Sequence, residues 1–388
     1  MKKVPDPFFR VLSLILLATI GPGPAALGEG PEAPAMPRVR VSEDGKRFVL
    51  AGSGRTFAPW GFNYLGRPER LAEDDWQTPE GWGRIEGDFR AMRKLGANVV
   101  RWHLQFETFM KGPDRVDAGQ IARLKKLLGL ARESGLYLDL TGLNCFRLKR
   151  IPAWYDELAE ADRWKAQARF WEAVAETCAG DSAVFCYDLM NEPIIGEPPK
   201  GDHPWVGGEL GGFHFVQRIS NKPAGRDSQE IAEAWIKTLV DAIRRRDRET
   251  PVTVGVIPWA QVWPGAKPLF YSPRVARHLD FTSIHFYPAA GKLEKDLAAL
   301  AALAVYDIGK PLVVEEIFPL SCSLVDLDRF IDGSADRVDG WISHYFGITP
   351  AEYRAGTQPN GAIIAEFLDY WQKKGKAIEA PGRVTGPP

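Results

Sequence analysis

Two glutamates close apolar segments that lie far apart in this 388-residue chain. Glu192 follows the apolar residues 184–190 within Asn-Glu-Pro, and Glu316 ends the segment 311–316. Buried strands have this composition, so each glutamate is predicted at the C-terminal end of a strand. A pair of carboxyl groups, one protonated and one ionised, is what the hydrolysis of a glycosidic bond requires. One such glutamate alone is as often a salt-bridge partner, so the hypothesis rests on the pair.

Polar side chains at other strand ends could serve this pair. Arg101 and His103 alternate with Trp102 at the end of one apolar segment, so both should face the same side. His285 and Tyr287 end another segment in the same way. An arginine beside a carboxylate lowers its pKa and orients it, and a tyrosine hydroxyl can hydrogen-bond the ionised form. The structural alternative is that Arg101 only braces the floor of the scaffold, and that His285 and Tyr287 only form an amphipathic strand end.

These residues must be held by a scaffold of strands and helices. Apolar segments alternate about eight times with stretches of helical periodicity, at residues 57–64, 97–103, 136–140, 184–190, 251–256, 281–288, 311–316 and 338–343. Such alternation predicts a parallel sheet, and eight rounds favour a closed (β/α)8 barrel, an α/β TIM fold, with extended βα loops. Asp44-Gly45 predicts a short N-terminal hairpin that caps the barrel bottom. Residues 194–226 are predicted to form one long loop after the fourth strand.

The motifs at these strand ends resemble glycoside hydrolase family 5, a group of retaining β-glycosidases. The similarity lies in "ANVVR", "LMNEP", "HFY" and "KPLVVEE", in this order, and covers most of residues 57–341. It implies that Glu192 is the acid/base, that Glu316 is the nucleophile and that Asn191 contacts the sugar 2-hydroxyl. It also implies substrate-site roles for Arg101, His285, Tyr287 and an aromatic residue on the eighth strand, here Trp341. No cofactor or metal is implied.

The chain departs from the family pattern at three places. Members commonly carry a histidine after the third strand, where this chain has Thr141, and His103 is expected to substitute in part. Ile317-Phe318 follow the nucleophile position, where a glycine is common after the aromatic residue. On the eighth strand Trp341 matches one tryptophan of the pattern, but His344 stands where another often lies.

Glu315 competes with Glu316 for the role of nucleophile. Counting from Pro311 along the family pattern favours Glu316. Successive residues of a strand face opposite sides, so we expect only one of the two to point into the barrel mouth.

The N-terminal residues predict that the protein is exported. Residues 1–28 combine a basic start, the apolar stretch VLSLILLATI and a small-residue cleavage site, which is typical of a signal peptide. Residues 29–37 are predicted to be a linker, 38–376 the barrel and 377–388 a loose tail. The prediction is therefore a secreted or periplasmic monomer without a membrane partner after signal cleavage. The spacing of the four cysteines indicates buried thiols, although a Cys178–Cys186 bridge stays open.

The composition of the chain limits the classes of molecule that it is expected to bind. The formal net charge of −1 offers no electrostatic case for nucleic acid. The 13 Trp, 10 Tyr and 20 Phe suit either a large core or a cleft that stacks on sugar rings. The leading hypothesis is a retaining β-glycoside hydrolase, an endo-β-glycanase or β-glycosidase acting on β-mannan or β-glucan. The alternatives are a non-catalytic carbohydrate-binding barrel and a transglycosylase.

Overall fold

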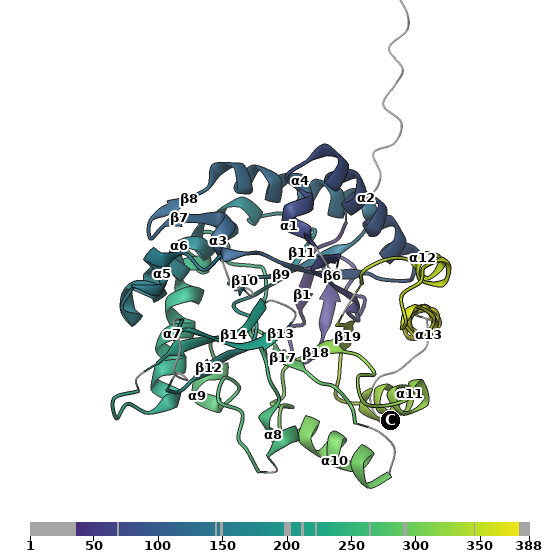
Figure 1. Cartoon of the computed structure of the whole chain (residues 1–388). Helices are drawn as coiled ribbons and strands as arrows, with labels where there is room; N and C mark the ends of the chain where they lie inside the picture. Colours follow the sequence, from purple (N-terminus) through teal and green to yellow (C-terminus); the bar gives the residue numbers. More distant parts are fainter. Residues whose placement is uncertain are drawn as a thin grey trace, which may run out of the picture. The chain divides into compact units, whose positions relative to one another are not determined.

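The structure, a computed structural model, describes most of the chain from residue 36 to residue 379 (Figure 1). The described part has gaps at residues 68–69, 144–145, 148–149, 198–202, 211–212, 222, 264, 290–292 and 345. The predicted signal peptide, nearly all of the predicted linker, Cys145 and residues 380–388 of the predicted tail lie outside it. The last helix runs to Glu379, so residues 377–379 are helical.

Eight parallel strand positions form the central barrel, as the sequence predicted. In chain order they are β3 (Trp60–Tyr64), β6 (Val99–His103), β9 (Tyr137–Thr141), β11 (Val184–Asp188), β15 (Val252–Thr253) with β16 (Gly255–Val256), β17 (Thr282–His285), β18 (Leu312–Ile317) and β19 (Gly340–Ser343). Strand β19 pairs with β3, and the fifth position closes the barrel because β15 pairs with β11 while β16 pairs with β17. Parallel pairing brings all strand C-termini to one mouth.

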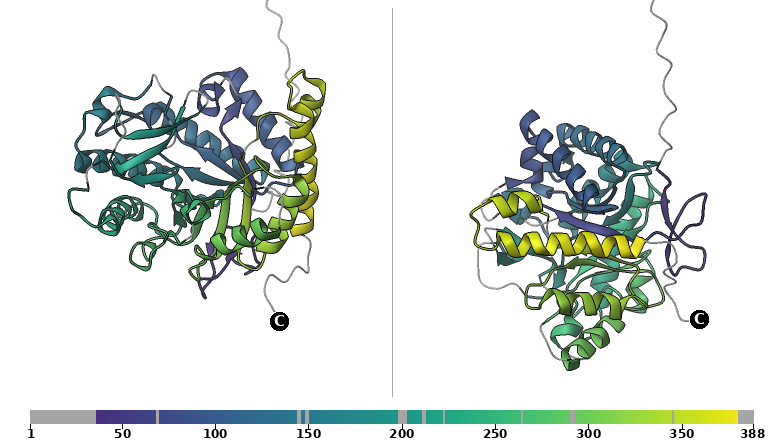
Figure 2. Two further views of the ribbon diagram at one scale, coloured as in Figure 1. Left: turned by 60° about the horizontal axis from the view of Figure 1, so that its bottom comes forward. Right: turned by 90° about the vertical axis from the view of Figure 1, so that its right-hand side faces the viewer.

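Helices surround this barrel (Figures 1 and 2). They are α1 (Ala72–Asp75), α2 (Pro79–Lys94), α3 (Phe106–Phe109), α4 (Ala118–Ser134), α5 (Ala153–Asp156), α6 (Glu160–Cys178), α7 (Ser228–Arg244), α8 (Trp259–Val262), α9 (Pro273–Ala276), α10 (Leu293–Ala304), α11 (Leu324–Ser334), α12 (Pro350–Ala355) and α13 (Gly361–Glu379). Local sequence sets several boundaries. The Asp117 carboxylate accepts a hydrogen bond from the Gln120 amide at the start of α4, and Gly135 ends that helix in the left-handed conformation (φ 64°).

A hairpin of β1 (Val39–Val41) and β2 (Phe48–Leu50) packs at the N-terminal ends of the barrel strands, where the sequence predicted a cap. The Phe48 ring meets the rings of Phe185 and Phe281 edge-on at 5.0 and 5.1 Å between centroids. The right-hand view of Figure 2 shows this hairpin at one end of the barrel. The apolar plug at this end leaves the other end for chemistry.

The segment expected to be a long loop contains strands instead. Strands β12 (Pro193–Ile195), β13 (Val206–Leu210) and β14 (Phe213–Ser220) join β10 (Phe146–Arg147) in a second sheet. Its centre is β14, which pairs with the other three. The Gly, Pro and polar residues of this segment concealed these strands, because they interrupt the apolar alternation from which a strand is predicted. Two smaller ribbons pair β4 (Gly66–Arg67) with β5 (Arg70–Leu71), and β7 (Met110–Gly112) with β8 (Arg115–Val116).

Two of the described cysteines were candidates for a bridge. Cys178 and Cys186 are both buried and unbridged, so the bridge left open by the sequence is absent, and Cys322 is partly buried. Within the described ranges, no helix is long and apolar enough to cross a membrane.

Candidate active site

Glu192 and Glu316 meet at the mouth of the barrel. A carboxylate oxygen of each and a ring nitrogen of His285 all lie within 4.8 Å of one another. Glu192 follows β11 and Glu316 is in β18, so the two come from opposite sides of the barrel. Both side chains keep a small opening to solvent, with 8% and 7% of their surface exposed.

Glu192 is held in an unusual backbone conformation. Its φ is +50°, in the left-handed region that non-glycine residues rarely adopt and that costs roughly 1–3 kcal/mol. The Glu192 amide donates a hydrogen bond to the Gly255 carbonyl oxygen at 2.9 Å, across the gap between strands four and five. Pro193 then starts β12, so the second sheet anchors the chain immediately after the carboxylate.

His285 is the direct partner of Glu192. Its Nδ1 lies 2.8 Å from Oε1 of Glu192 and 3.6 Å from Oε2 of Glu316. Burial acts to lower the pKa of His285, but the charge of Glu316 and hydrogen bonding to Glu192 raise it to about 10. His285 is therefore an imidazolium at neutral pH, and Nδ1–H donates to Glu192.

Glu316 is surrounded by donors. Arg101 donates from Nη1 to Oε1 at 2.7 Å, and the Tyr287 hydroxyl donates to Oε2 at 2.6 Å. His344 Nδ1 lies 3.2 Å from the same Oε2. Burial opposes ionisation, but His285 and His344 hold the pKa of Glu316 well below its ordinary value. Burial and the neighbouring Glu316 charge raise the pKa of Tyr287, so its hydroxyl keeps the proton that it donates.

Arg101 is fully buried and links the site to the barrel interior. Its Nη2 donates to Oδ2 of Asp188 at 2.7 Å and to Oδ1 of Asn191 at 3.1 Å. Its Nη1 also donates to Oδ1 of Asn63 at 2.8 Å. Burial raises the pKa of Asp188 to about 6, although Arg101 opposes the shift. From β6, this arginine therefore fixes polar residues of three other barrel strands, β3, β11 and β18.

Asn191 is positioned by the second sheet. Its Nδ2 donates to the backbone carbonyl of Phe215 in β14 at 2.9 Å, while its Oδ1 accepts from Arg101. The two bonds leave the Asn191 side chain little rotational freedom. The segment predicted to be a loop therefore helps to hold a predicted substrate-binding residue in place.

A β-bulge in β18 corrects the expectation for Glu315. His285 pairs with Glu316 while Ile284 pairs with Val314, so one extra residue is inserted at Glu315. Both glutamates therefore face the barrel interior. Glu316 reaches the mouth, and Glu315 is fully buried below it, with Oε2 at 3.6 Å from Nε of Arg101.

Gly255 lies against this buried carboxylate. A Cβ atom at this position would stand 2.5 Å from Oε2 of Glu315 and 2.6 Å from Nε2 of His285. Its amide donates to Oδ1 of Asp188 at 2.8 Å. The absence of a side chain is what lets the fifth strand approach the charged interior.

Comparison with known proteins assigns the chain to a family. The family model "Cellulase (glycosyl hydrolase family 5)" matches residues 55–316, which is most of the chain. The protein belongs to glycoside hydrolase family 5. A search of the curated proteins finds no match. The family membership makes this barrel a glycosidase whose substrate class is carbohydrate, as the sequence predicted.

Solved structures share the fold of this family 5 chain at low identity. An exo-β-1,4-mannosidase from an Opitutaceae bacterium superposes with a TM-score of 0.60 and 17% identity, covering 87% of this chain and 62% of the neighbour. The endoglucanase Cel5A catalytic domain of Thermobifida fusca gives 0.55 and 18%, covering 85% and 97%. A β-1,4-mannanase from the sea hare Aplysia kurodai gives 0.56 and 15%, covering 90% and 99%. At this identity they establish the barrel and not the substrate.

Most residues predicted for the family 5 site gather at the barrel mouth, namely Glu192, Glu316, Arg101, Asn191, His285 and Tyr287. His103 is one step removed, because its Nε2 lies 2.9 Å from Oδ1 of Asn63, which also accepts from Arg101. Trp341 does not join them. It is 2% exposed, belongs to the main apolar core and packs edge-on against Trp60.

Three polar residues of the site were not predicted. His344 contacts both Tyr287 and Glu316 from the position that follows β19, where the sequence analysis noted a departure without assigning a role. Asn63 and Asp188 each occupy a polar position near the end of an apolar strand. That position was the available signal, and it is the same one that singled out Arg101.

Among the described residues, two sets of side chains have ligand atoms close enough to bind one cation. They are Glu192, His285 and Glu316 at the mouth, and Asp139, Cys186 and Glu315 below it. In the upper set Nδ1 of His285 hydrogen-bonds Oε1 of Glu192 at 2.8 Å. The upper set is therefore suited to proton transfer, and the lower set is treated below.

Proposed function

We propose that this family 5 enzyme is a retaining β-glycoside hydrolase with Glu316 as nucleophile and Glu192 as acid/base. The observation that carries the proposal is the short gap between their carboxylate oxygens, at most 4.8 Å. Retaining enzymes place the two carboxyl groups about 5–5.5 Å apart, whereas inverting enzymes leave about 6.5–9.5 Å for a water molecule. The short separation in this site favours direct attack of the Glu316 carboxylate on the sugar, as in retaining enzymes.

The neighbours of each carboxylate support its role. Glu316 is held ionised by donors at 2.7 Å from Arg101 and 2.6 Å from Tyr287, which leaves it ready to attack the anomeric carbon. Glu192 shares a hydrogen bond with an imidazolium, so the pair of Glu192 and His285 carries one proton that can pass to the leaving oxygen. A glycosyl ester forms on Glu316, and Glu192 then takes a proton from water as the ester breaks.

An exposed aromatic pair supports a sugar chain as substrate. Trp259 and Trp263 stack with centroids 5.0 Å apart and are 37% and 59% exposed. Their short helix is tied to the site because Gln261 donates to the Tyr287 carbonyl at 2.7 Å. A cavity of about 220 Å³ lies between Trp259 and Pro193, the residue after the proposed acid. Flat aromatic faces of this kind pack against the apolar faces of pyranose rings.

Among β-linked chains, β-mannan and β-glucan are the proposed substrates. Two of the structural neighbours are a mannosidase and a mannanase, and a third is an endoglucanase. The experiment is turnover of aryl β-mannosides, aryl β-glucosides and the two classes of polymer, with NMR of the first anomer released. Release of the β-anomer supports the proposal, and release of the α-anomer contradicts it.

The same assay separates the alternatives. A non-catalytic binding barrel gives no product across the panel but shows saturable binding to a glycan by calorimetry. A transglycosylase gives elongated products at early times in place of reducing ends. The contacts between Glu192, Glu316 and their partners favour hydrolysis over binding alone, since a binding barrel needs neither an ionised nucleophile nor a shared proton.

We also propose that the enzyme is exported and works outside the cytoplasm. The support is the basic start and apolar stretch within residues 1–28. Mass spectrometry of the protein recovered from the periplasm or medium tests this, with a mature N-terminus near Glu29 as the expected result.

A further inference from the structure

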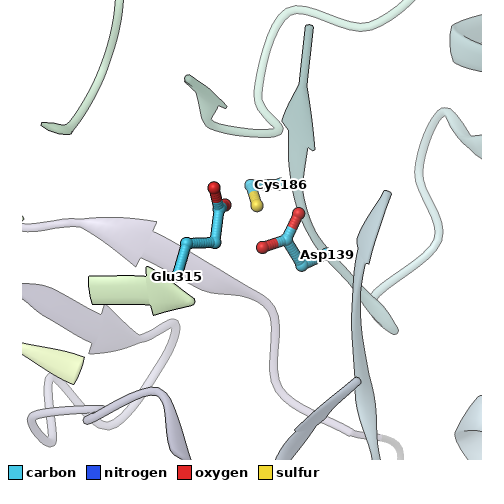
Figure 3. Close-up of side chains that lie close together, drawn as sticks. All are labelled: Asp139, Cys186 and Glu315. Atoms are coloured by element: carbon cyan, nitrogen blue, oxygen red, sulfur yellow. The ribbon is translucent and has the colours of Figure 1, made fainter. Parts of the chain in front are cut away.

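Below the proposed catalytic pair lies a second pair of carboxyl groups. Asp139 of β9 and Glu315 of β18 are both fully buried, and Figure 3 shows their carboxyl groups pointing toward each other beside Cys186. An oxygen of each and the Cys186 sulfur all lie within 4.8 Å of one another. Two carboxylates this close in a low-dielectric interior cannot both be ionised without a compensating positive charge.

The buried carboxyl oxygens that receive no hydrogen bond show where a compensating proton or cation is needed. Oε1 of Glu315 and both oxygens of Asp139 are buried and receive no hydrogen bond from any donor in the described part of the chain. The other oxygen of Glu315, Oε2, is already occupied by the Ser283 hydroxyl, and Arg101 and His285 lie beside it. Glu315 thus has cations beside it, whereas Asp139 has Glu315 and the Cys186 thiol within 4.8 Å.

We propose that Asp139 is a positioning residue that carries a proton and donates it in a hydrogen bond to Glu315, so that Glu315 stays ionised beneath the reaction centre. The geometry favours a proton over a metal ion, because a divalent cation here would stand next to Arg101 and the His285 imidazolium and be repelled by both. The role in turnover rests on the proposed function of Glu192 and Glu316.

The two pKa values diverge in the direction that this assignment needs. Burial and the charge of Glu315 raise the pKa of Asp139 well above its ordinary value. For Glu315 burial acts in the same direction, but Arg101 and a hydrogen bond to His285 lower the pKa to about 2. Burial also raises the pKa of the Cys186 thiol, which remains neutral.

Glu315 lies beside two residues that contact the proposed catalytic pair. Its Oε2 lies 3.7 Å from Nε2 of His285, whose Nδ1 contacts Glu192, and 3.6 Å from Nε of Arg101, which donates to Glu316. The ionised Glu315 therefore favours the charged form of the histidine that shares a proton with the acid/base. In the described part of the chain, the charged or titratable groups around Glu315 are Arg101 of β6, Asp139 of β9, Cys186 and Asp188 of β11, Tyr271, His285 of β17 and Glu316 of β18.

The experiment compares Asp139→Asn with Asp139→Leu. Asparagine keeps a donor toward Oε1 of Glu315, and leucine removes it at similar volume. We expect Asp139→Asn to keep kcat within about threefold, and Asp139→Leu to lower kcat about tenfold or more with little change in KM. In Glu315→Gln the alkaline limb of the pH profile should move to lower pH, because His285 loses the negative charge that stabilises its protonated form. In Asp139→Leu this limb should move less, because Glu315 loses a donor but keeps its charge.

A spectroscopic measurement keeps the test independent of activity and of the folding of Asp139→Leu. Difference infrared spectra of wild type minus Asp139→Asn should contain the carbonyl stretch of a protonated carboxylic acid at neutral pH, and its absence overturns the proposal. Cys186→Ala is the matched control, and we expect unchanged activity and pH profile. Bound metal in the purified wild type that Cys186→Ala and Asp139→Asn both lose would assign the cluster to a cation instead. If wild type turns over no glycoside, the proposed function fails while the infrared result still decides the protonation of Asp139.

Discussion

Two pairs of carboxyl groups lie in this barrel at different depths. The upper pair, Glu192 and Glu316, is 8% and 7% exposed at the mouth, and the lower pair, Asp139 and Glu315, is fully buried. In each pair one carboxyl group is associated with a proton, and the other is ionised and contacts positively charged side chains. In the upper pair His285 supplies the proton partner of Glu192, and in the lower pair Asp139 itself holds the proton.

The difference between the pairs lies in access and not in side-chain chemistry. The upper carboxylates open toward the mouth and can reach a sugar, whereas the lower ones contact only the interior. Arg101 and His285 lie between the pairs and contact both, so the lower pair can set the charge of the groups that the upper pair uses. The buried Glu315 can therefore stay ionised, because the proton of Asp139 and the charges of Arg101 and His285 compensate its negative charge.

The largest expected effect separates the two glutamates of the bulge. Glu316→Gln should lower kcat on the order of 10⁴-fold or more, because no ester can form, while the protein stays folded. Glu315→Gln should keep much more activity. Steady-state kinetics with circular dichroism as the folding control checks this. An equal or larger loss in a folded Glu315→Gln would exchange the roles of the two pairs.

Glu192→Gln should have the next largest effect, and it should depend on the leaving group. We expect a loss of about 10²- to 10⁴-fold for natural glycans, because general acid catalysis contributes this much. Aryl glycosides with acidic phenols leave without protonation, so their first step should be far less affected. The measurement is a series of aryl glycosides of varied leaving-group pKa, and a uniform loss across the series would argue against Glu192 as the acid.

Tyr287→Phe tests the donors that hold the upper pair. Loss of a hydrogen bond to a charged group costs about 1.5–3 kcal/mol, or roughly ten- to a hundredfold in kcat. The pKa of Glu316 is depressed, so its activity is present above that pKa and is lost as pH falls. Removing the hydroxyl raises the pKa, and the acid limb of the kcat profile should move to higher pH. An unmoved acid limb would exclude Tyr287 as the group that stabilises the ionised nucleophile.

Gly255→Ala probes the boundary between the pairs. The new methyl group would stand 2.5 Å from Glu315 and 2.6 Å from His285, so one of them must shift. We expect unfolding to become easier by about 1–3 kcal/mol and kcat to fall by about tenfold. Thermal unfolding and kinetics at one pH are the measurements. Gly83→Ala on α2, a glycine that like Gly255 has no positive φ and that has nothing near the added Cβ, controls for the loss of a glycine.

A change outside both pairs provides the smallest effect. Trp263→Ala should raise KM for polymeric substrate by about three- to tenfold through lost stacking and leave kcat on a small aryl glycoside unchanged. Ile363→Ala, an exposed apolar residue on α13, is the control. A loss on the small substrate would show that the tryptophan pair also supports the catalytic groups.

Sequence patterns predicted the barrel and most of the mouth because both depend on local regularities. Each strand is an apolar segment bounded by helical periodicity. Glu192, His285, Tyr287 and Glu316 each stand near or just beyond a strand end, and Arg101 stands two residues before the end of β6. Parallel pairing brings such ends together without any knowledge of distances. The same reasoning failed for Trp341, because matching a motif does not say which face of the strand a side chain takes.

Sequence alone predicted the eight-stranded barrel, the candidate carboxylates and several of their charge partners, since residue type and strand position are sufficient for these. Tertiary structure decided which of two adjacent glutamates reaches the mouth, because the bulge in β18 turns both inward and alternation no longer applies. It also decided that His344 joins Glu316 and that Asp139 meets Glu315. Asp139 and Glu315 stand 176 residues apart in the chain, and only the closed barrel defines the distance between them.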